Sequence, residues 1–253
     1  MDLEYCRILD TNINVITMDG AVDYILSNIE ELRGKYICVS NVHTTVMSHD
    51  NPSYNKVQNS AAMALPDGRP LSVESRKRGH TNASRVTGPD LMTELFKLSG
   101  ERPIRHYFYG GKEETLTILE EKLREKYPAI CIAGMYSPPF RKLTEEEDKA
   151  DVDRINAARP DIVWIGLGAP KQENWMYAHQ GRINAVTIGV GAGFDYHAGT
   201  IKRAPKWMQK MSLEWLYRLL QDPKRLFKRY LTTNFRYLYL VSLERIREKK
   251  HKR

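Results

Sequence analysis

Short apolar runs alternate with segments of helical periodicity along most of this chain. The apolar runs predict strands over 36–40, 61–65, 105–109, 129–133, 162–165 and 185–190. Apolar positions spaced three or four residues apart predict helices over 19–32, from 43–47 onward, and over 89–98, 112–126, 144–158 and 170–179. Strands that alternate with helices predict an α/β fold: a mostly parallel, Rossmann-like sheet with helices on both faces.

The pattern changes after Gly199. Two basic amphipathic helices with interspersed aromatic residues are predicted over 205–220 and 223–239. Residues 202–253 carry a net charge of +12, whereas residues 1–201 carry −4. We therefore expect an α/β core over 1–200 and a basic helical appendage over 201–253.

The charge of the appendage suggests an anionic partner, which could be a membrane surface, a nucleic acid or a phosphorylated substrate. Cations and aromatic side chains on one helix suit the headgroup region of an anionic membrane. The alternative is a pair of helices that pack on the core and expose their charges to water.

The remaining composition argues against several classes. The chain has no apolar run of about 18 residues, as a membrane-spanning helix requires. Its first residues do not resemble a signal peptide. Cys6, Cys38 and Cys131 lie far apart and show neither zinc-site nor disulfide spacing. We expect a cytoplasmic protein.

The segment 161–175 contains the most informative polar cluster. An apolar strand opens into a turn with Gly166 and Gly168, and Lys171, Gln172 and Glu173 follow where the next helix begins. This arrangement brings backbone N–H groups, a cation and an amide to the carboxyl end of a strand, where helix N-termini favour anions. It predicts a site for a phosphate-bearing ligand; an ordinary strand–helix turn is the alternative.

Other turns add candidates. Asp67 follows a strand in a Pro-Asp-Gly turn and is either a general base or a simple turn residue. Three further glycines belong to turns where the backbone could approach a phosphate or a base: Gly110, Gly111 and Gly191. The run around Gly191 lies too late in the chain to be a dinucleotide fingerprint.

Six motifs occur in a fixed order: Leu-Pro-Asp-Gly at 65–68, Arg-Val-Thr-Gly-Pro-Asp at 85–90, Tyr-Gly-Gly at 109–111, Tyr-Ser-Pro-Pro-Phe at 136–140, Gly-Leu-Gly-Ala-Pro-Lys-Gln-Glu at 166–173 and Gly-Val-Gly-Ala-Gly-Phe-Asp at 189–195. This series closely resembles the WecG/TagA/CpsF family of bacterial glycosyltransferases, from about residue 39 to residue 229. The resemblance implies an inverting enzyme at the inner face of the plasma membrane. Such an enzyme transfers N-acetylmannosamine or a related hexose from a UDP donor to a polyprenyl-diphosphate-linked sugar, for teichoic acid or surface polysaccharide synthesis.

The resemblance also implies roles for individual residues. Asp67 matches the proposed base, and Asn41 and Gln172 match residues of the donor pocket. Val39 stands where the family often has threonine, so a hydroxyl group is missing and the identity of the transferred sugar stays open. In the family the appendage is thought to close over the site and bring arginines to the diphosphates, and Arg218 and Arg225 are the candidates here.

The donor diphosphate needs positive charge, and no Asp-x-Asp pair follows a strand in this chain. The resemblance likewise implies catalysis without an essential metal, so we expect no cofactor. Arg85 and Lys171 are candidate cations, although Arg85 could be a surface charge. Tyr136 could stack on a substrate ring or fill the core. Whether the protein forms a homo-oligomer is left open.

Two other functions remain as alternatives. A nucleic-acid-binding protein would use the basic aromatic tail to hold phosphates and stack bases. A regulator that binds sugar nucleotides without catalysis would not need Asp67. The sequence favours the enzyme over nucleic-acid binding, because nucleic-acid binding leaves the glycine turns without a role.

Overall fold

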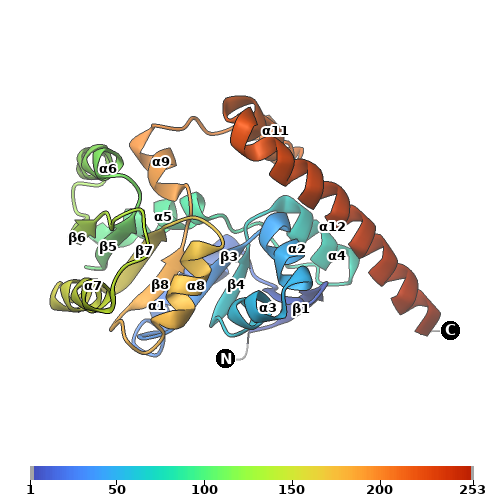
Figure 1. The fold of residues 1–253 in the computed structure, drawn as a ribbon, viewed down its shortest axis with the longest axis horizontal. Helices are drawn as coiled ribbons and strands as arrows, with labels where there is room; N and C mark the ends of the chain where they lie inside the picture. The colour runs from blue at the N-terminus through green and yellow to red at the C-terminus, as the bar shows by residue number, and fades with distance from the viewer. Residues whose placement is uncertain (1–2, 252–253) are drawn as a thin grey trace.

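A parallel sheet forms the centre of the computed structural model, which describes residues 3–251 apart from the side chains of residues 210, 225, 229, 248, 249 and 251 (Figure 1). Its six strands lie in the order β4-β3-β8-β7-β5-β6, and every neighbouring pair is parallel. The strands are β3 (Tyr36–Ser40), β4 (Met63–Pro66), β5 (Arg105–Gly110), β6 (Cys131–Tyr136), β7 (Ile162–Gly166) and β8 (Val186–Gly189). The predicted α/β fold is confirmed.

Helices cover both faces of this sheet. Consecutive residues such as Tyr36 and Ile37 are both fully buried, in separate apolar clusters on opposite faces. One cluster receives α1 (Met18–Ser27), α5 (Gly88–Lys97), α6 (Glu113–Lys126) and α9 (Gly193–Ala198). The other receives α2 (Val42–Asp50), α4 (Arg69–Lys77), α7 (Glu145–Ala157) and α8 (Lys171–Ala178).

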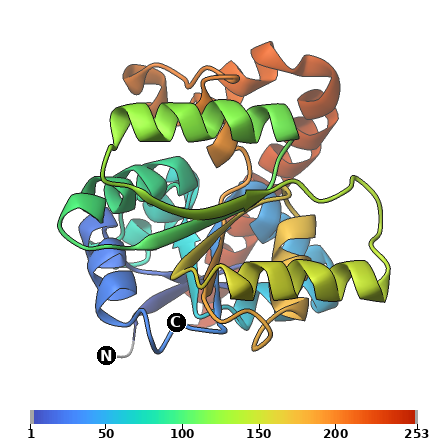
Figure 2. The ribbon, with the colours of Figure 1, turned by 90° about the vertical axis from the view of Figure 1, so that its left-hand side faces the viewer.

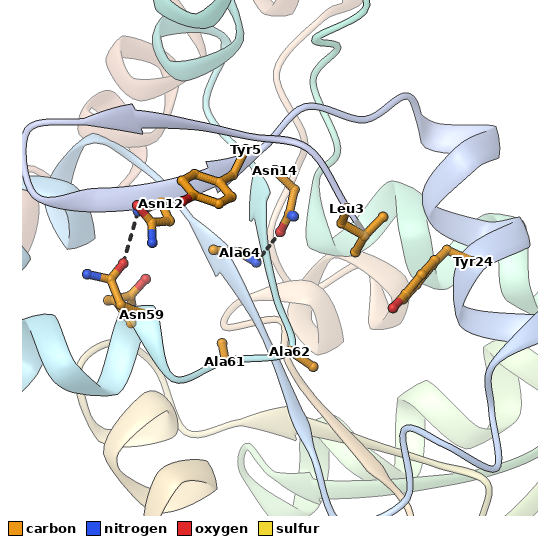
Figure 3. Close-up of a pocket in the computed structure, with 10 residues that line it drawn as sticks. Leu3, Tyr5, Asn12, Asn14, Tyr24, Asn59, Ala61, Ala62 and Ala64 are labelled. Carbon is orange, nitrogen blue, oxygen red and sulfur yellow. Dashed lines mark hydrogen bonds between the residues drawn. The ribbon is translucent and has the colours of Figure 1, made fainter. Parts of the chain in front are cut away.

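The N-terminal hairpin was not anticipated from the sequence. Strands β1 (Tyr5–Ile8) and β2 (Thr11–Asn14) pair antiparallel. The Asn14 side chain accepts a hydrogen bond from the backbone N–H of Ala64 at 2.7 Å, which ties the hairpin to β4. Figure 3 shows this bond at the wall of a cavity of about 340 Å³ between the hairpin and the start of β4. The hydrophobic pattern likewise did not indicate α3 (Pro52–Asn59), α4 or α9, which are eight, nine and six residues long.

The C-terminal region is helical, as predicted, but its helices differ from the expected ones. The helix expected over 205–220 is two short helices, α10 (Lys206–Lys210) and α11 (Glu214–Gln221), separated where Ser212 has φ 64°. Pro223 is the first residue of a separate helix, α12 (Pro223–His251), where its missing N–H costs nothing. Among residues 3–251 no helix is both long enough and apolar enough to cross a membrane.

Helix α12 runs past α2 and α4 on the β4 side of the sheet (Figure 1), whereas Figure 2 views the molecule from the opposite, β6 side. Tyr237 and Val241 are buried in the same apolar cluster as the hairpin. Arg245 forms an ion pair with Glu74, which is 3% exposed. These contacts fix the far end of the appendage to the body. The division at residue 200 stays a prediction.

Candidate active site

The candidate residues converge on the edge of the sheet where the strands end. Asn41 follows β3, Asp67 follows β4, and Gly191 lies just after β8, while Gly110 and Gly166 end β5 and β7. The chain crosses from one half of the sheet to the other between β4 and β5, so that β3 and β8, which lie side by side, belong to different halves. In open α/β sheets this reversal leaves a crevice in which ligands bind.

Asp67 is held by its backbone at this edge. Its N–H donates to the carbonyl of Ser40 at 2.8 Å, and its carbonyl accepts a hydrogen bond from Arg85 Nε at 2.9 Å. Burial is the main influence on its carboxyl group and raises the pKa of Asp67 to about 6. The positive charges of Arg85 and Arg218 and a hydrogen bond from Asn41 oppose this rise, and the charge of Glu214 adds to it. A carboxylate with such a pKa can accept a proton near neutral pH.

Asn41 has a second role that the sequence did not reveal. Its side-chain oxygen caps α2 by accepting hydrogen bonds from the N–H groups of His43 at 3.0 Å and Thr44 at 3.3 Å. The Thr44 hydroxyl in turn accepts from the N–H of Asn41 at 2.9 Å. The cap fixes the orientation of the amide, whose nitrogen is left for Asp67.

The appendage reaches the surroundings of Asp67. Glu214, at the start of α11, forms an ion pair with Arg85. The Arg218 guanidinium, one turn further along α11, lies 5.7 Å from the centre of the Tyr196 ring and acts electrostatically on Asp67. These contacts bring one of the two predicted tail arginines to the base. The side chain of Arg225 lies outside the described residues.

The glycines at the ends of β5 and β7 allow close packing between neighbouring segments. A Cβ atom on Gly110 would lie 2.8 Å from the carbonyl carbon of Gly166, and one on Gly166 would lie 2.6 Å from the Phe194 ring. The N–H of Gly111 donates to the Gly166 carbonyl at 3.1 Å, so it is already used. Gly168 has φ 75°, and a Cβ atom there would meet no described atom within 4 Å, so the turn leaves open space beside it.

Gln172 and Glu173 are almost completely buried, with 4% and 0% of their surfaces exposed. Gln172 accepts a hydrogen bond from the N–H of Gly191 at 3.0 Å and donates to Glu173 at 2.8 Å. A ligand cannot reach Glu173 in this structure, so its assignment to the ligand-contacting residues is corrected. Through Gln172 it is connected to the loop of Gly191, whose N–H is likewise occupied.

The polar chain continues behind Glu173. The hydroxyl of Tyr54, on α3, helps to stabilise the Glu173 carboxylate, although burial is the larger effect and raises the pKa of Glu173. Tyr54 accepts from Gln58 at 3.0 Å, and Gln58 accepts from the Ser40 hydroxyl at 2.7 Å. The residue after Ser40 is Asn41. Buried hydrogen bonds thus connect the ends of β3 and β8 beneath the site.

Lys171 and Tyr136 lie on the other side of the crevice. Lys171 begins α8 after β7, and its amino group lies 5.4 Å from the centre of the Phe140 ring. The guanidinium of Arg154 covers one face of Tyr136 at 3.8 Å from the ring centre. Strands β7 and β4 are separated by β8 and β3, a span of about 14 Å at roughly 4.8 Å per strand. The structure therefore does not bring Lys171 and Arg85 together.

The structure adds charged residues that the sequence analysis did not select. Arg203 binds Asp90 at 2.5 Å, and Glu214 pairs with Arg85. Asp90 belongs to the Arg-Val-Thr-Gly-Pro-Asp motif, which was the available signal for its partner. Within residues 3–251 no group of three or more His, Cys, Asp and Glu side chains is arranged to hold a metal ion.

Comparison with known proteins decides the family. The sequence pattern described as "Glycosyl transferase WecG/TagA/CpsF family" matches residues 6–251. The chain belongs to this family. It is therefore a glycosyltransferase, and the resemblance seen in the six motifs is confirmed.

Two relatives carry the same descriptive name, N-acetylglucosaminyldiphosphoundecaprenol N-acetyl-beta-D-mannosaminyltransferase. The protein of Bacillus spizizenii (strain ATCC 23059 / NRRL B-14472 / W23) is 33% identical over 198 residues, which cover 78% of this chain and 75% of the relative. That of Bacillus subtilis (strain 168) is 33% identical over 214 residues, which cover 83% and 81%. Together with the family, these relatives support a glycosyltransferase that acts on a polyprenyl-linked acceptor.

Proposed function

We propose that this glycosyltransferase transfers N-acetylmannosamine, or a related hexose, from a UDP donor to a sugar on a polyprenyl diphosphate, with inversion at the anomeric carbon. The observation that carries the proposal is the partly buried Asp67, with its pKa near 6, at the carboxyl edge of the sheet beside the two cations Arg85 and Arg218. The names of the two relatives support the sugar and the type of acceptor.

In the proposed reaction the Asp67 carboxylate takes the proton from the acceptor hydroxyl. The hydroxyl oxygen forms a bond to the anomeric carbon while the bond from that carbon to the phosphate oxygen of UDP breaks. Arg218, which acts on Asp67, is a candidate for stabilising the charge that develops on the diphosphate. A single in-line displacement with one base inverts the configuration.

The proposal also places the protein at the inner face of the plasma membrane. Four apolar side chains on α12, Phe227, Leu231, Phe235 and Leu238, are each at least half exposed and share one helix face at spacings of four, four and three residues. Trp207 on α10 and Trp215 on α11 are also exposed. Apolar surface of this kind beside many cations suits an anionic bilayer.

The test is to identify the products made from a panel of UDP-sugars and a lipid-linked N-acetylglucosamine acceptor by mass spectrometry. Transfer of one hexose residue with inverted configuration supports the proposal, and the donor that gives the highest kcat/KM names the sugar. Failure of every donor to yield a glycosylated lipid, with UDP binding intact, would contradict it. The pathway, teichoic acid or another surface polysaccharide, follows from the polymer that is lost when the protein is depleted in cells.

A further inference from the structure

A basic cavity of about 350 Å³ lies between α4 and α10, beside the proposed catalytic base. Four of the residues that line it are cationic, and none is acidic. Its lining consists of Arg69, Ser72, Arg76, Arg85, Lys206 and Gln209. A cavity with this lining has the chemistry of an anion site.

Two of the four cations that line the cavity have protein partners, and two have no carboxylate partner among the described residues. Arg85 is paired with Glu214, and Arg76 donates to the carbonyl of Ala83 at 2.7 Å. In the part of the chain that the structure describes, neither Arg69 nor Lys206 lies within 4.0 Å of a carboxylate oxygen. Two positive charges thus face a cavity without protein counter-charges, and a ligand can supply these.

The position of the cavity indicates which ligand. Arg69 is two residues after Asp67, and Arg85 lines the cavity while donating to the Asp67 carbonyl at 2.9 Å. Lys206 and Gln209 belong to α10. Two apolar side chains beside them are exposed to solvent: Trp207 on α10 is 58% exposed, and Met211, directly after the helix, is 63% exposed. An anion in the cavity therefore lies between the base and an exposed apolar surface.

We infer that this cavity binds the diphosphate of the lipid-linked acceptor, with the acceptor sugar toward Asp67 and the polyprenyl chain along α10. The inference rests on the proposed function and adds to it a separate site for the second diphosphate of the reaction. In this arrangement the donor diphosphate lies in the crevice toward β8, on the far side of β3 from the cavity. The donor and acceptor diphosphates are both negatively charged and repel each other, so each needs its own cations. The cations on the two sides of Asp67 can meet this need.

The direct test substitutes the two cations without carboxylate partners. Arg69→Gln and Lys206→Gln, singly and together, are assayed in detergent with two acceptors that bear the same sugar, one on a short polyprenyl diphosphate and one on an uncharged alkyl chain. We expect each substitution to raise KM for the diphosphate acceptor about tenfold, as the loss of a hydrogen bond to a charged group does. Rates with the alkyl acceptor and KM for the donor stay unchanged.

Matched controls remove a positive charge elsewhere. Lys77→Gln alters an exposed lysine at the end of α4, and Lys224→Gln alters one in the first turn of α12. Neither lines the cavity, so both leave KM for the diphosphate acceptor unchanged. Thermal unfolding of all variants verifies that they are folded. An equal effect of the controls, or equal losses with both acceptors, would overturn the inference.

Anionic lipid headgroups are the other source of phosphate. Binding to phosphatidylglycerol vesicles without acceptor is measured for the same variants. If Arg69→Gln and Lys206→Gln reduce vesicle binding but not the affinity for the diphosphate acceptor in detergent, the cavity is a headgroup site and the inference fails. The proposed function fails separately, if the unsubstituted protein transfers no sugar to either acceptor.

Discussion

Two carboxylic acids near the crevice, Asp67 and Glu173, look alike in sequence and differ in their surroundings. Each follows a strand in a short motif, and burial raises the pKa of each. Asp67 is partly exposed and has charged neighbours from α11 and from the loop of Arg85. Glu173 is completely buried among Gln172, Tyr54 and the sheet.

The comparison shows that the groups around a carboxyl group decide which role it can have. The charges around Asp67 come from the side chains of Arg85, Arg218 and Glu214, so its protonation can respond to a change in these charges. The partners of Glu173 are uncharged, and they join it to Gln172 and the loop of Gly191. We therefore expect one acid to move a proton and the other to hold the site in shape.

The largest effect is expected from Asp67→Asn. Loss of the proton acceptor should lower kcat by roughly 10²-fold or more, because general-base catalysis contributes about 10²–10⁴-fold. UDP binding, measured by calorimetry, should remain close to that of the unsubstituted protein. A kcat within a few-fold of the original under saturating substrates would refute the assignment of Asp67 as the base.

The same substitution has a measurable consequence for stability. Below about pH 4 the carboxyl is protonated in both the folded and the unfolded protein. Between pH 4 and about 6 the unfolded chain loses this proton first, so the free energy of unfolding falls as the pH rises through this window. Asn at position 67 lacks this penalty, and urea unfolding at pH 7 should show the variant to be at least as stable as the original.

The second prediction concerns Arg218→Ala. The positive charge of Arg218 lowers the pKa of Asp67, so its removal should raise that pKa above about 6 and shift the acid limb of kcat/KM to higher pH. At pH 7 we also expect kcat to fall about tenfold, if Arg218 makes a charge-assisted hydrogen bond to the leaving diphosphate. A pH–rate profile measures both changes; an unshifted acid limb would show that Arg218 does not act on the base.

The residue types at the strand ends could be predicted from the sequence, because parallel strands place their carboxyl ends along one edge. Asp67 and Gly168 were selected in this way, and Asn41 was selected through the family resemblance. The pattern of residues alone could not predict contacts from distant segments, and the approach of Arg218 was expected only from the family resemblance. Glu214 and Arg218 reach Asp67 only because the chain breaks at Ser212 and α11 folds back across the site. The direction in which Glu173 points depends on Tyr54, more than 100 residues earlier in a helix that the pattern did not reveal.

The fold shows the same limit. The six strands of the parallel sheet stand out as apolar runs, and all six were recognised, although β4 and β8 are only four residues long. The hairpin strands are four residues each, and TNIN in β2 has little apolar character. The hairpin is held through tertiary contacts such as the bond from Ala64 to Asn14, which no local pattern contains.

The third prediction is Glu214→Gln, which should shift the acid limb in the opposite direction to Arg218→Ala. The negative charge of Glu214 raises the pKa of Asp67, and its removal should lower that pKa and retain activity at more acidic pH. The substitution also removes the ion pair with Arg85, which keeps its hydrogen bond to the Asp67 carbonyl. Opposite shifts in the two variants would demonstrate that α11 sets the protonation of the base; shifts in the same direction would contradict it.

The smallest effect is expected from Glu173→Gln, which makes at position 173 the same chemical change that Asp67→Asn makes at 67. The amide oxygen can still accept the hydrogen bond from Gln172, and burial already disfavours the charge of Glu173. We therefore expect kcat and the acid limb of the pH profile to be unchanged. Glu173→Ala is the matched disruptive variant, because it leaves the buried Gln172 amide without its acceptor. That loss should cost about 1–3 kcal/mol of stability and raise KM for the donor through displacement of the Gly191 loop. If Glu173→Gln instead lowered kcat as strongly as Asp67→Asn does, Glu173 would be part of the proton-transfer chemistry, and the distinction between the two acids would be wrong.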